Sequence, residues 1–225
     1  MEAKERAARS AVSRIKTGQI LGLGTGSTVQ YALEALAQRI RDENLQVLGV
    51  PTSMQTQREC ERLGIPLTTL EQHPVLDLAF DGADQVDSDL QCIKGYGGAL
   101  LREKIVASAT RCFLVMVDEG KVAPRLNKPI PVEVLPFGVP VARGFLEKIG
   151  HPVLRQPGKK LYETDNGNQV FDVDLGEVPD ARELAIELDA IPGVVGHGLF
   201  IDLATELHVG SANDVRVVLS HPSVE

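Results

Sequence analysis

The first 120 residues alternate between short apolar runs and longer amphipathic segments. The apolar runs predict strands at 19–24, 45–51, 77–84 and 112–120. Apolar residues spaced three or four positions apart predict helices at 27–41, 54–64 and 98–109, the second of which ends at Gly64. Strands that alternate with helices in this way form βαβ units with parallel strands. This half of the chain therefore predicts a parallel, three-layer α/β sheet.

The pattern changes near Asn127. A proline-rich, extended stretch is followed by a predicted helix at 141–150, a predicted hairpin at 160–175 around the Asn166-Gly167 turn, and a helix at 181–191. This order predicts a small α+β unit inserted into the first domain. The last segment, 198–219, is expected to return strands to the main sheet.

Composition and charge exclude several classes of protein. The chain has 225 residues, 43% of them hydrophobic, and a net charge of −8. No run of eighteen apolar residues predicts a membrane span, and the N-terminus lacks the apolar core of an export signal. No basic cluster indicates a nucleic-acid partner. Three cysteines without CxxC spacing indicate reduced thiols in a cytoplasmic protein.

A glycine-rich loop, "GLGTGST" at 22–28, joins the first strand to the first long helix. Free N–H groups at a helix start favour an anion, and glycines let the ligand approach the backbone. The spacing is G-x-G-x-G rather than G-x-G-x-x-G, the second strand does not end in a carboxylate, and no lysine completes a P-loop. The loop therefore favours a small phosphorylated metabolite over a nucleotide. The alternative is a tight turn that binds nothing.

The stretch "DGADQVDSDLQCIKGYGGALLREK" at 81–104 is rich in charge but does not match a metal loop. Its aspartates do not fit the EF-hand spacing, and the histidines of the chain form no ligand pair. We therefore expect no metal. Asp81 and Asp84 follow one strand, the glycine loop follows another and Lys121 follows a third, so all are expected at the carboxyl edge of the sheet.

Glu103 is expected in the first turns of the helix that begins near Gly98. There the helix N-terminus favours an ionised carboxylate. A carboxylate beside a lysine is suited to removing a proton next to a carbonyl while the cation stabilises the enediolate oxygen. With a phosphate anchor, this predicts aldose–ketose isomerisation of a sugar phosphate. The alternatives are a solvated glutamate and an aspartate-capped turn.

The motifs "GLGTGST", "DGAD", "KGYGGALLREKIV", "DEGK", "PIPVEVLPF", "TDNGN" and "IPGVVGHGLF" occur in the order typical of ribose-5-phosphate isomerase type A, and the chain resembles this family over nearly its whole length. The resemblance implies a Rossmann-like catalytic domain, 1–127 and 201–225, with an inserted ferredoxin-like α+β domain, 128–200. It implies interconversion of D-ribose 5-phosphate and D-ribulose 5-phosphate in the pentose phosphate pathway. It also implies no cofactor and a homodimer or homotetramer.

The same resemblance assigns roles to individual residues. Glu103 matches the general base, and Lys94 matches the lysine that stabilises the enediolate. Asp81 and Asp84 match the carboxylates that bind sugar hydroxyls, with Asp81 assisting ring opening. Lys4 is similar to an N-terminal lysine near the phosphate. The other expected substrate contacts are Thr25, Gly26, Ser27, Thr28, Gly82, Ala83, Gly95, Tyr96, Gly97 and Lys121.

Two positions depart from the family pattern. Gln85 stands where members commonly carry Glu, and Tyr96 replaces a residue that is often small. Neither is an expected catalytic side chain, but Tyr96 is placed to affect specificity. Two other functions remain open: a non-catalytic sugar-phosphate sensor, and another enzyme on this fold, such as an acyl-CoA transferase with a nucleophilic glutamate.

Overall fold

The structure is a computed structural model, and it describes residues 2–158 and 160–220. The chain divides into two compact units. The first is built from the residues up to Ala83, from Arg102–Val122 and from Asp202 onwards, and the second from Asp84–Leu101 and Ala123–Ile201. Residues 84–101 and 123–127 thus group with the second unit, outside the predicted insertion at 128–200, whose boundaries stay a prediction.

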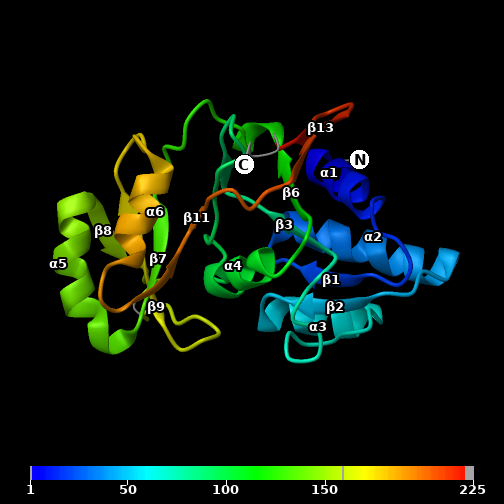
Figure 1. Cartoon of the computed structure of the whole chain (residues 1–225), viewed down its shortest axis with the longest axis horizontal. Coiled ribbons are helices and arrows are strands. Elements are labelled where there is room, and N and C mark those ends of the chain that lie inside the picture. Colours follow the sequence, from blue (N-terminus) through cyan, green and yellow to red (C-terminus); the bar gives the residue numbers. More distant parts are fainter. Residues whose placement is uncertain (1, 159, 221–225) are drawn as a thin grey trace. The chain divides into compact units, whose positions relative to one another are not determined.

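The first unit contains a six-stranded sheet (Figure 1). The strands lie in the order β13-β12-β6-β3-β1-β2 and are parallel except for β13, which pairs antiparallel with β12 at one edge. The elements of this unit are α1 (Ala3–Val12), β1 (Ile20–Leu23), α2 (Ser27–Glu43), β2 (Leu48–Pro51), α3 (Met54–Leu63), β3 (Leu78–Gly82), β6 (Phe113–Asp118), η1 (Glu119–Lys121), β12 (Glu206–Gly210) and β13 (Val215–Leu219). Helix α4 (Leu100–Ser108) begins in the second unit and has most of its length in the first.

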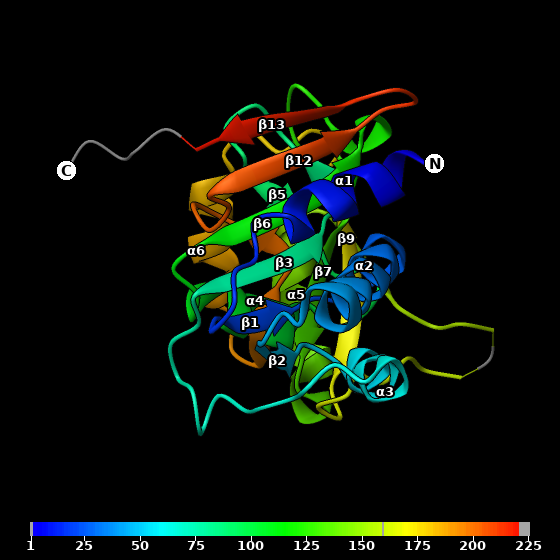
Figure 2. The same cartoon turned by 90° about the vertical axis from the view of Figure 1, so that its right-hand side faces the viewer.

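Alternation along the strands gives this sheet two different faces. Leu21 and Leu23 of β1 join the core beneath α1, α2 and α3, which lie on one side of the sheet in Figure 2. Gly22 faces the other side, where a Cβ would lie 2.4 Å from Cγ1 of Val106 on α4. A side chain at position 22 would push α4 away, so this glycine permits close packing of the helix against the sheet.

The second unit has the ferredoxin-like element order β-α-β-β-α-β. Its four-stranded antiparallel sheet has the strand order β10-β7-β9-β8. The elements are β7 (Ile130–Val134), η2 (Pro136–Gly138), α5 (Val139–Ile149), β8 (His151–Leu154), β9 (Gln169–Asp174), α6 (Ala181–Asp189) and β10 (Val194–His197). A small three-stranded sheet is formed by β4 (Gln85–Val86), β5 (Cys92–Ile93) and β11 (Leu199–Phe200). The predicted fold class, a Rossmann-like domain with an inserted ferredoxin-like domain, is confirmed.

The predicted hairpin at 160–175 is wrong in its first arm. The second arm is β9, but its antiparallel neighbours are β7 and β8 rather than residues 160–165. The Asn-Gly turn does form, with Gly167 at φ 77° and its N–H donating to the carbonyl of Thr164 at 2.9 Å. The chain before it, from 155 onwards, is irregular where the structure describes it. Glycine, proline and charge in "RQPGKKLYETDNGN" oppose strand pairing there.

No helix in the described ranges is long and apolar enough to cross a membrane.

Candidate active site

The glycine loop lies where β1 ends and α2 begins, as predicted. Gly26, at φ 127°, precedes α2, and no side chain of the described residues caps the helix start. The first turn of α2 also carries no acidic residue. Ser27 is exposed, and its Oγ accepts a hydrogen bond from Nζ of Lys4 at 3.2 Å. The helix N-terminus, a hydroxyl and an ammonium group therefore gather at one point that is suited to an anion.

The hydroxyl of Thr25 faces a cluster of other hydroxyls. Its Oγ1 lies 2.8 Å from Oγ1 of Thr52, 2.8 Å from Oγ of Ser53 and 3.0 Å from Oγ1 of Thr56. Thr56 in turn donates to the carbonyl of Gly24 at 2.7 Å. We call Thr25, Thr52, Ser53 and Thr56 the hydroxyl cluster. It ties the glycine loop to the start of α3, where Ser53 also accepts from the N–H of Thr56.

Asp81 is held directly by the glycine loop. It lies at the end of β3, next to β1 in the sheet, and is 2% exposed. Its Oδ1 accepts from the N–H of Thr25 at 3.1 Å and from the N–H of Gly82 at 2.7 Å. A Cβ at Gly24 would lie 2.2 Å from Cγ of Asp81. The predicted phosphate loop and the predicted ring-opening carboxylate thus form one connected element.

Glu103 lies in the first turn of α4 and is 4% exposed. Burial of this kind argues against a solvated surface glutamate. Lys121 ends η1 directly after β6 and is half-buried. Because β3 and β6 are parallel neighbours, Asp81 near the end of β3 and Lys121 after the end of β6 lie at the same edge of the sheet.

The remaining predicted site residues belong to the second unit. Lys94 follows β5 and is 2% exposed, and its N–H donates to the carbonyl of Gly198 at 2.8 Å. Its Nζ lies 5.3 Å from the centroid of the Phe200 ring, a cation–π contact. Asp84 lies directly before β4, an edge strand of the small sheet. Its Oδ2 accepts a hydrogen bond from the N–H of Tyr96 at 3.0 Å.

The two departures from the family pattern have structural roles. Gln85 is buried, donates to Oδ1 of Asn127 at 2.7 Å and accepts from the N–H of the same residue at 2.8 Å. Tyr96 donates its hydroxyl to the carbonyl of Pro129 at 3.1 Å. Burial, with Asp84 and Asp172 adding to it, raises the pKa of Tyr96 to about 12. Both side chains bond to the backbone of residues 127–129, directly before β7.

The motifs "PIPVEVLPF" and "TDNGN" meet at a buried carboxylate. Oε1 of Glu133, on β7, accepts from Oγ1 of Thr164 at 2.8 Å, Nδ2 of Asn168 at 2.9 Å and Nδ2 of Asn166 at 3.2 Å. These bonds fix the Asn-Gly turn against β7. The residues of these two motifs therefore have a structural role, which is to hold the turn against β7.

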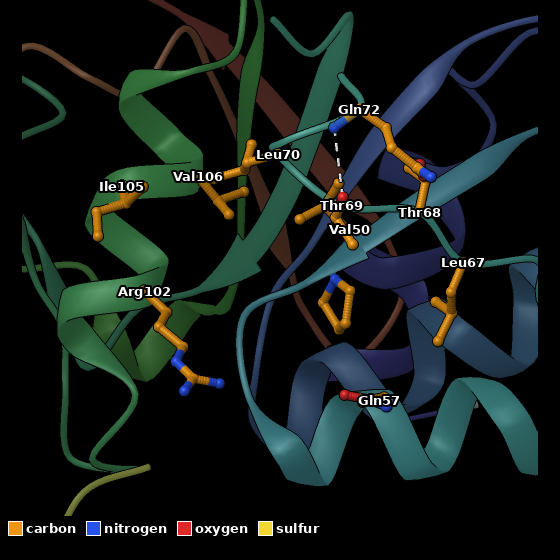
Figure 3. Close-up of a pocket in the computed structure, with 11 residues that line it drawn as sticks. Val50, Gln57, Leu67, Thr68, Thr69, Leu70, Gln72, Arg102, Ile105 and Val106 are labelled. Atoms are coloured by element: carbon orange, nitrogen blue, oxygen red, sulfur yellow. Dashed lines mark hydrogen bonds between the residues drawn. The ribbon is translucent and has the colours of Figure 1, made fainter. Parts of the chain in front are cut away.

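The first unit also contains a pocket of about 470 Å³ that none of the predicted site residues lines (Figure 3). It lies between the end of β2, the segment 67–72 and α4. Its walls are largely apolar, with the guanidinium of Arg102 extending from α4. In the described part of the chain, no three His, Cys, Asp or Glu side chains are grouped so as to hold a metal ion.

The sequence patterns did not identify the side chains that hold the predicted site residues in place. Three of the four residues of the hydroxyl cluster lie in "PTSMQT" at the end of β2, and these hydroxyls at a strand end were an available signal because β2 neighbours β1. Arg155 and Tyr162, which contact the chain after Lys94, lie in the irregular segment before β9. No local pattern there indicates a role.

Comparison with known proteins gives a consistent result. The family model of ribose 5-phosphate isomerase A (phosphoriboisomerase A) matches residues 48–214. A ribose-5-phosphate isomerase A of Methanosarcina acetivorans is 49% identical over 96% of this chain and 94% of its own, and one of Nitrobacter hamburgensis is 47% identical over 96% of both chains.

Solved structures agree over the same length. The ribose 5-phosphate isomerase A of Methanocaldococcus jannaschii is 39% identical, with a TM-score of 0.92 over 96% of this chain and 98% of that one. A D-ribose-5-phosphate isomerase in complex with phospho-erythronic acid is 34% identical, with a TM-score of 0.93 over 97% of this chain and 100% of that one. This chain belongs to the ribose 5-phosphate isomerase A family.

Proposed function

We propose that this chain interconverts D-ribose 5-phosphate and D-ribulose 5-phosphate through an enediolate, with Glu103 carrying the proton. The observation that carries the proposal is a glutamate that is 4% exposed in the first turn of α4, in a chain of the isomerase family. The alternative of a non-catalytic sensor is not favoured, because the relatives that match over nearly the whole length are named as isomerases.

The phosphate end of the substrate binds at the glycine loop. Backbone N–H groups at the start of α2, the Ser27 hydroxyl and the Lys4 ammonium supply donors and positive charge. Thr28 and Gly26 complete the loop, and Lys121 adds a cation after β6, which is separated from β1 by β3. Thr25 positions the loop, because its hydroxyl is engaged in the hydroxyl cluster and its N–H in the bond to Asp81.

Asp81 and Asp84 bind the sugar hydroxyls. Asp81 is fixed by two backbone N–H groups on Oδ1, which preorganises the carboxylate before the substrate arrives. As a base, it takes the proton of the anomeric hydroxyl while the bond between C1 and the ring oxygen breaks, and it passes that proton to the ring oxygen, which becomes a hydroxyl; the reverse transfers close the ring. Gly82 and Ala83 provide the backbone between the two carboxylates, and Gly95, Tyr96 and Gly97 extend the surface after Lys94.

Glu103 removes the proton from C2 of the open aldose, and the electron pair moves into an enediolate. Lys94 stabilises the oxygen that gains negative charge. The proton on O2 moves to O1, Glu103 delivers the abstracted proton to C1, and the carbonyl re-forms at C2 as the ketose. The reverse sequence converts the ketose into the aldose, and no electrons leave the substrate.

The remaining features of the proposal concern the state of the protein. We expect activity without a metal or organic cofactor, a homodimer or homotetramer, and a cytoplasmic location. Size-exclusion chromatography with light scattering measures the assembly directly.

The first test is turnover of ribose 5-phosphate by protein that has been treated with a chelator, followed by the Glu103→Gln variant. The amide cannot accept the proton, so we expect kcat to fall by at least about 10³-fold. Inhibition by inorganic phosphate should be unchanged in the same variant. A folded wild-type protein without turnover would overturn the proposed function, and a variant with a nearly normal rate would remove Glu103 from the mechanism.

A further inference from the structure

The chain between Lys94 and Gly98 is a turn that glycine makes intrinsically mobile. Gly95 has φ 107° and Gly98 has φ 77°, both in the region that favours glycine. One hydrogen bond closes the turn, from the N–H of Gly98 to the carbonyl of Gly95 at 2.9 Å. This turn follows directly on Lys94 and leads along the chain to Glu103. Its conformation must therefore be fixed by contacts from elsewhere in the second unit.

Arg155, directly after β8, reaches two carbonyls of the turn. Its Nη1 lies 3.1 Å from the oxygen of Gly95 and 3.3 Å from the oxygen of Tyr96. The guanidinium is itself held by Asp172 of β9, with Nε 2.9 Å from Oδ2 and Nη2 bonded to Oδ1. This bidentate pair is largely buried on the arginine side, where the side chain is 15% exposed. Asp172 also neutralises the charge of Arg155, so the contact adds no net positive charge near Lys94.

Tyr162 supplies the third contact. Its hydroxyl donates to the carbonyl of Gly97 at 3.3 Å, and its ring lies 5.5 Å from the Arg155 guanidinium. The contact with the turn is close, since a Cβ at Gly98 would lie 1.8 Å from the Tyr162 hydroxyl oxygen. The carbonyls of Gly95, Tyr96 and Gly97 are thus all held by side chains from one segment.

We propose that Arg155, assisted by Tyr162, is a positioning residue that holds the turn after Lys94 and thereby orients the Lys94 ammonium toward the enediolate. Arg155 acts through the backbone of the turn and does not touch the substrate. The inference rests on the proposed role of Lys94. A guanidinium is needed because its several N–H groups, held in one plane, can donate to the carboxylate of Asp172 and to two successive carbonyls at the same time.

The test separates the enediolate end of the substrate from its phosphate end. Phospho-erythronic acid carries a carboxylate in place of the reacting carbons and reports on Lys94, whereas inorganic phosphate reports on the glycine loop. In Arg155→Lys, which keeps the charge beside Asp172, we expect kcat and phospho-erythronic acid affinity to fall about tenfold. Affinity for inorganic phosphate should change by less than about twofold. Tyr162→Phe should lower kcat and the affinity for phospho-erythronic acid about threefold, again with little change in the affinity for inorganic phosphate.

The matched control is Arg125→Ala in the same unit. Arg125 pairs with Glu177, and both side chains are exposed, at 68% and 58%. Its loss should leave both inhibitors and kcat unchanged. The inference is overturned if Arg155→Lys keeps the wild-type kcat, or if it weakens both inhibitors equally, as general loss of structure would. Wild-type protein without any turnover would instead contradict the proposed function.

Discussion

Two glycine-rich turns carry predicted site residues, and they are stabilised in different ways. The loop after β1 is held by its neighbours in the same sheet: the hydroxyl cluster at the end of β2 and the carboxylate of Asp81 at the end of β3. Strand pairing already brings these groups together. The turn after Lys94 is bonded to Asp84 through the N–H of Tyr96, but its carbonyls are held by Arg155 and Tyr162, about sixty positions further along the sequence.

The chemistry of the two supports also differs. A network of neutral hydroxyls and the carboxylate of Asp81 hold the first loop, whereas a partly buried ion pair and the phenol of Tyr162 hold the second. A phosphate dianion needs free N–H groups, and the neutral hydroxyls add no charge near the N-terminus of α2. An enediolate needs one well-placed cation, and a neutralised Arg155–Asp172 pair does not compete with Lys94 for it.

The largest difference between the turns should appear when a methyl group is added to each. In Gly24→Ala the new Cβ would lie 2.2 Å from Cγ of Asp81, a buried side chain that is fixed by two N–H donors. Because the carboxylate must move, kcat/KM should fall by about 10²-fold. In Gly98→Ala the obstacle is the end of the Tyr162 side chain, which can rotate, although φ 77° adds strain. For Gly98→Ala we expect kcat/KM to fall about tenfold.

Gly144→Ala is the control for both variants. Gly144 lies in α5, and nothing lies within 4 Å of the position that its Cβ would occupy. Steady-state kinetics with ribose 5-phosphate measure all three proteins. Equal losses in Gly24→Ala and Gly98→Ala would contradict the view that the first loop is rigidly supported and the second is held by movable side chains.

A smaller effect is expected from removing one hydroxyl of the cluster. Thr56→Val keeps the shape of the side chain but loses the bond to the carbonyl of Gly24 and the contact with Thr25. Stability should fall by about 1–3 kcal/mol, and inhibition by inorganic phosphate should weaken about fivefold, because the loop loses its support. Affinity for phospho-erythronic acid should fall by the same factor, since that ligand shares the phosphate. The equal loss distinguishes this variant from Arg155→Lys.

Thr56→Ser restores the hydroxyl and should recover most of the phosphate affinity. Thr68→Val is the matched control, because Thr68 is also buried and its hydroxyl donates to Oε1 of Gln72 at 2.9 Å, away from the loop. Urea unfolding and competitive inhibition measure the two effects. An unaltered phosphate affinity in Thr56→Val would show that the loop does not depend on the cluster.

The same comparison explains how far the sequence could predict the molecule. Periodicity located nearly every helix and strand of the first unit, because parallel strands and their covering helices have strong apolar patterns. It also placed the glycine loop, Asp81 and Glu103 on the correct elements. The return of the last segment to the sheet is confirmed by β12 and β13.

The missed features depend on contacts that local pattern does not encode. The predicted first arm of the hairpin is irregular, because β9 pairs with β8 instead, and Arg155 and Tyr162 lie in that irregular segment. Long-range pairing of this kind overrides local strand propensity. Residues 84–101 also group with the second unit, so sequence adjacency to Asp81 did not indicate which unit contains Lys94.

The smallest expected effect is a loss of stabilisation at alkaline pH, which the phenols of the second turn should show. Burial raises the pKa of Tyr96 to about 12 and also raises the pKa of Tyr162, whereas the threonine and serine hydroxyls of the first loop do not titrate. The folded state holds the phenol proton more tightly than the unfolded chain, whose tyrosines titrate near about 10. The stabilisation is therefore complete below about pH 10 and is lost as the pH rises toward 12. Urea unfolding of wild type and Tyr96→Phe should give a difference of about 1 kcal/mol at neutral pH, from the bond to Pro129, that narrows above about pH 10. If the difference stays constant across that range, the phenol proton does not stabilise the second turn, and the two turns do not differ in this respect.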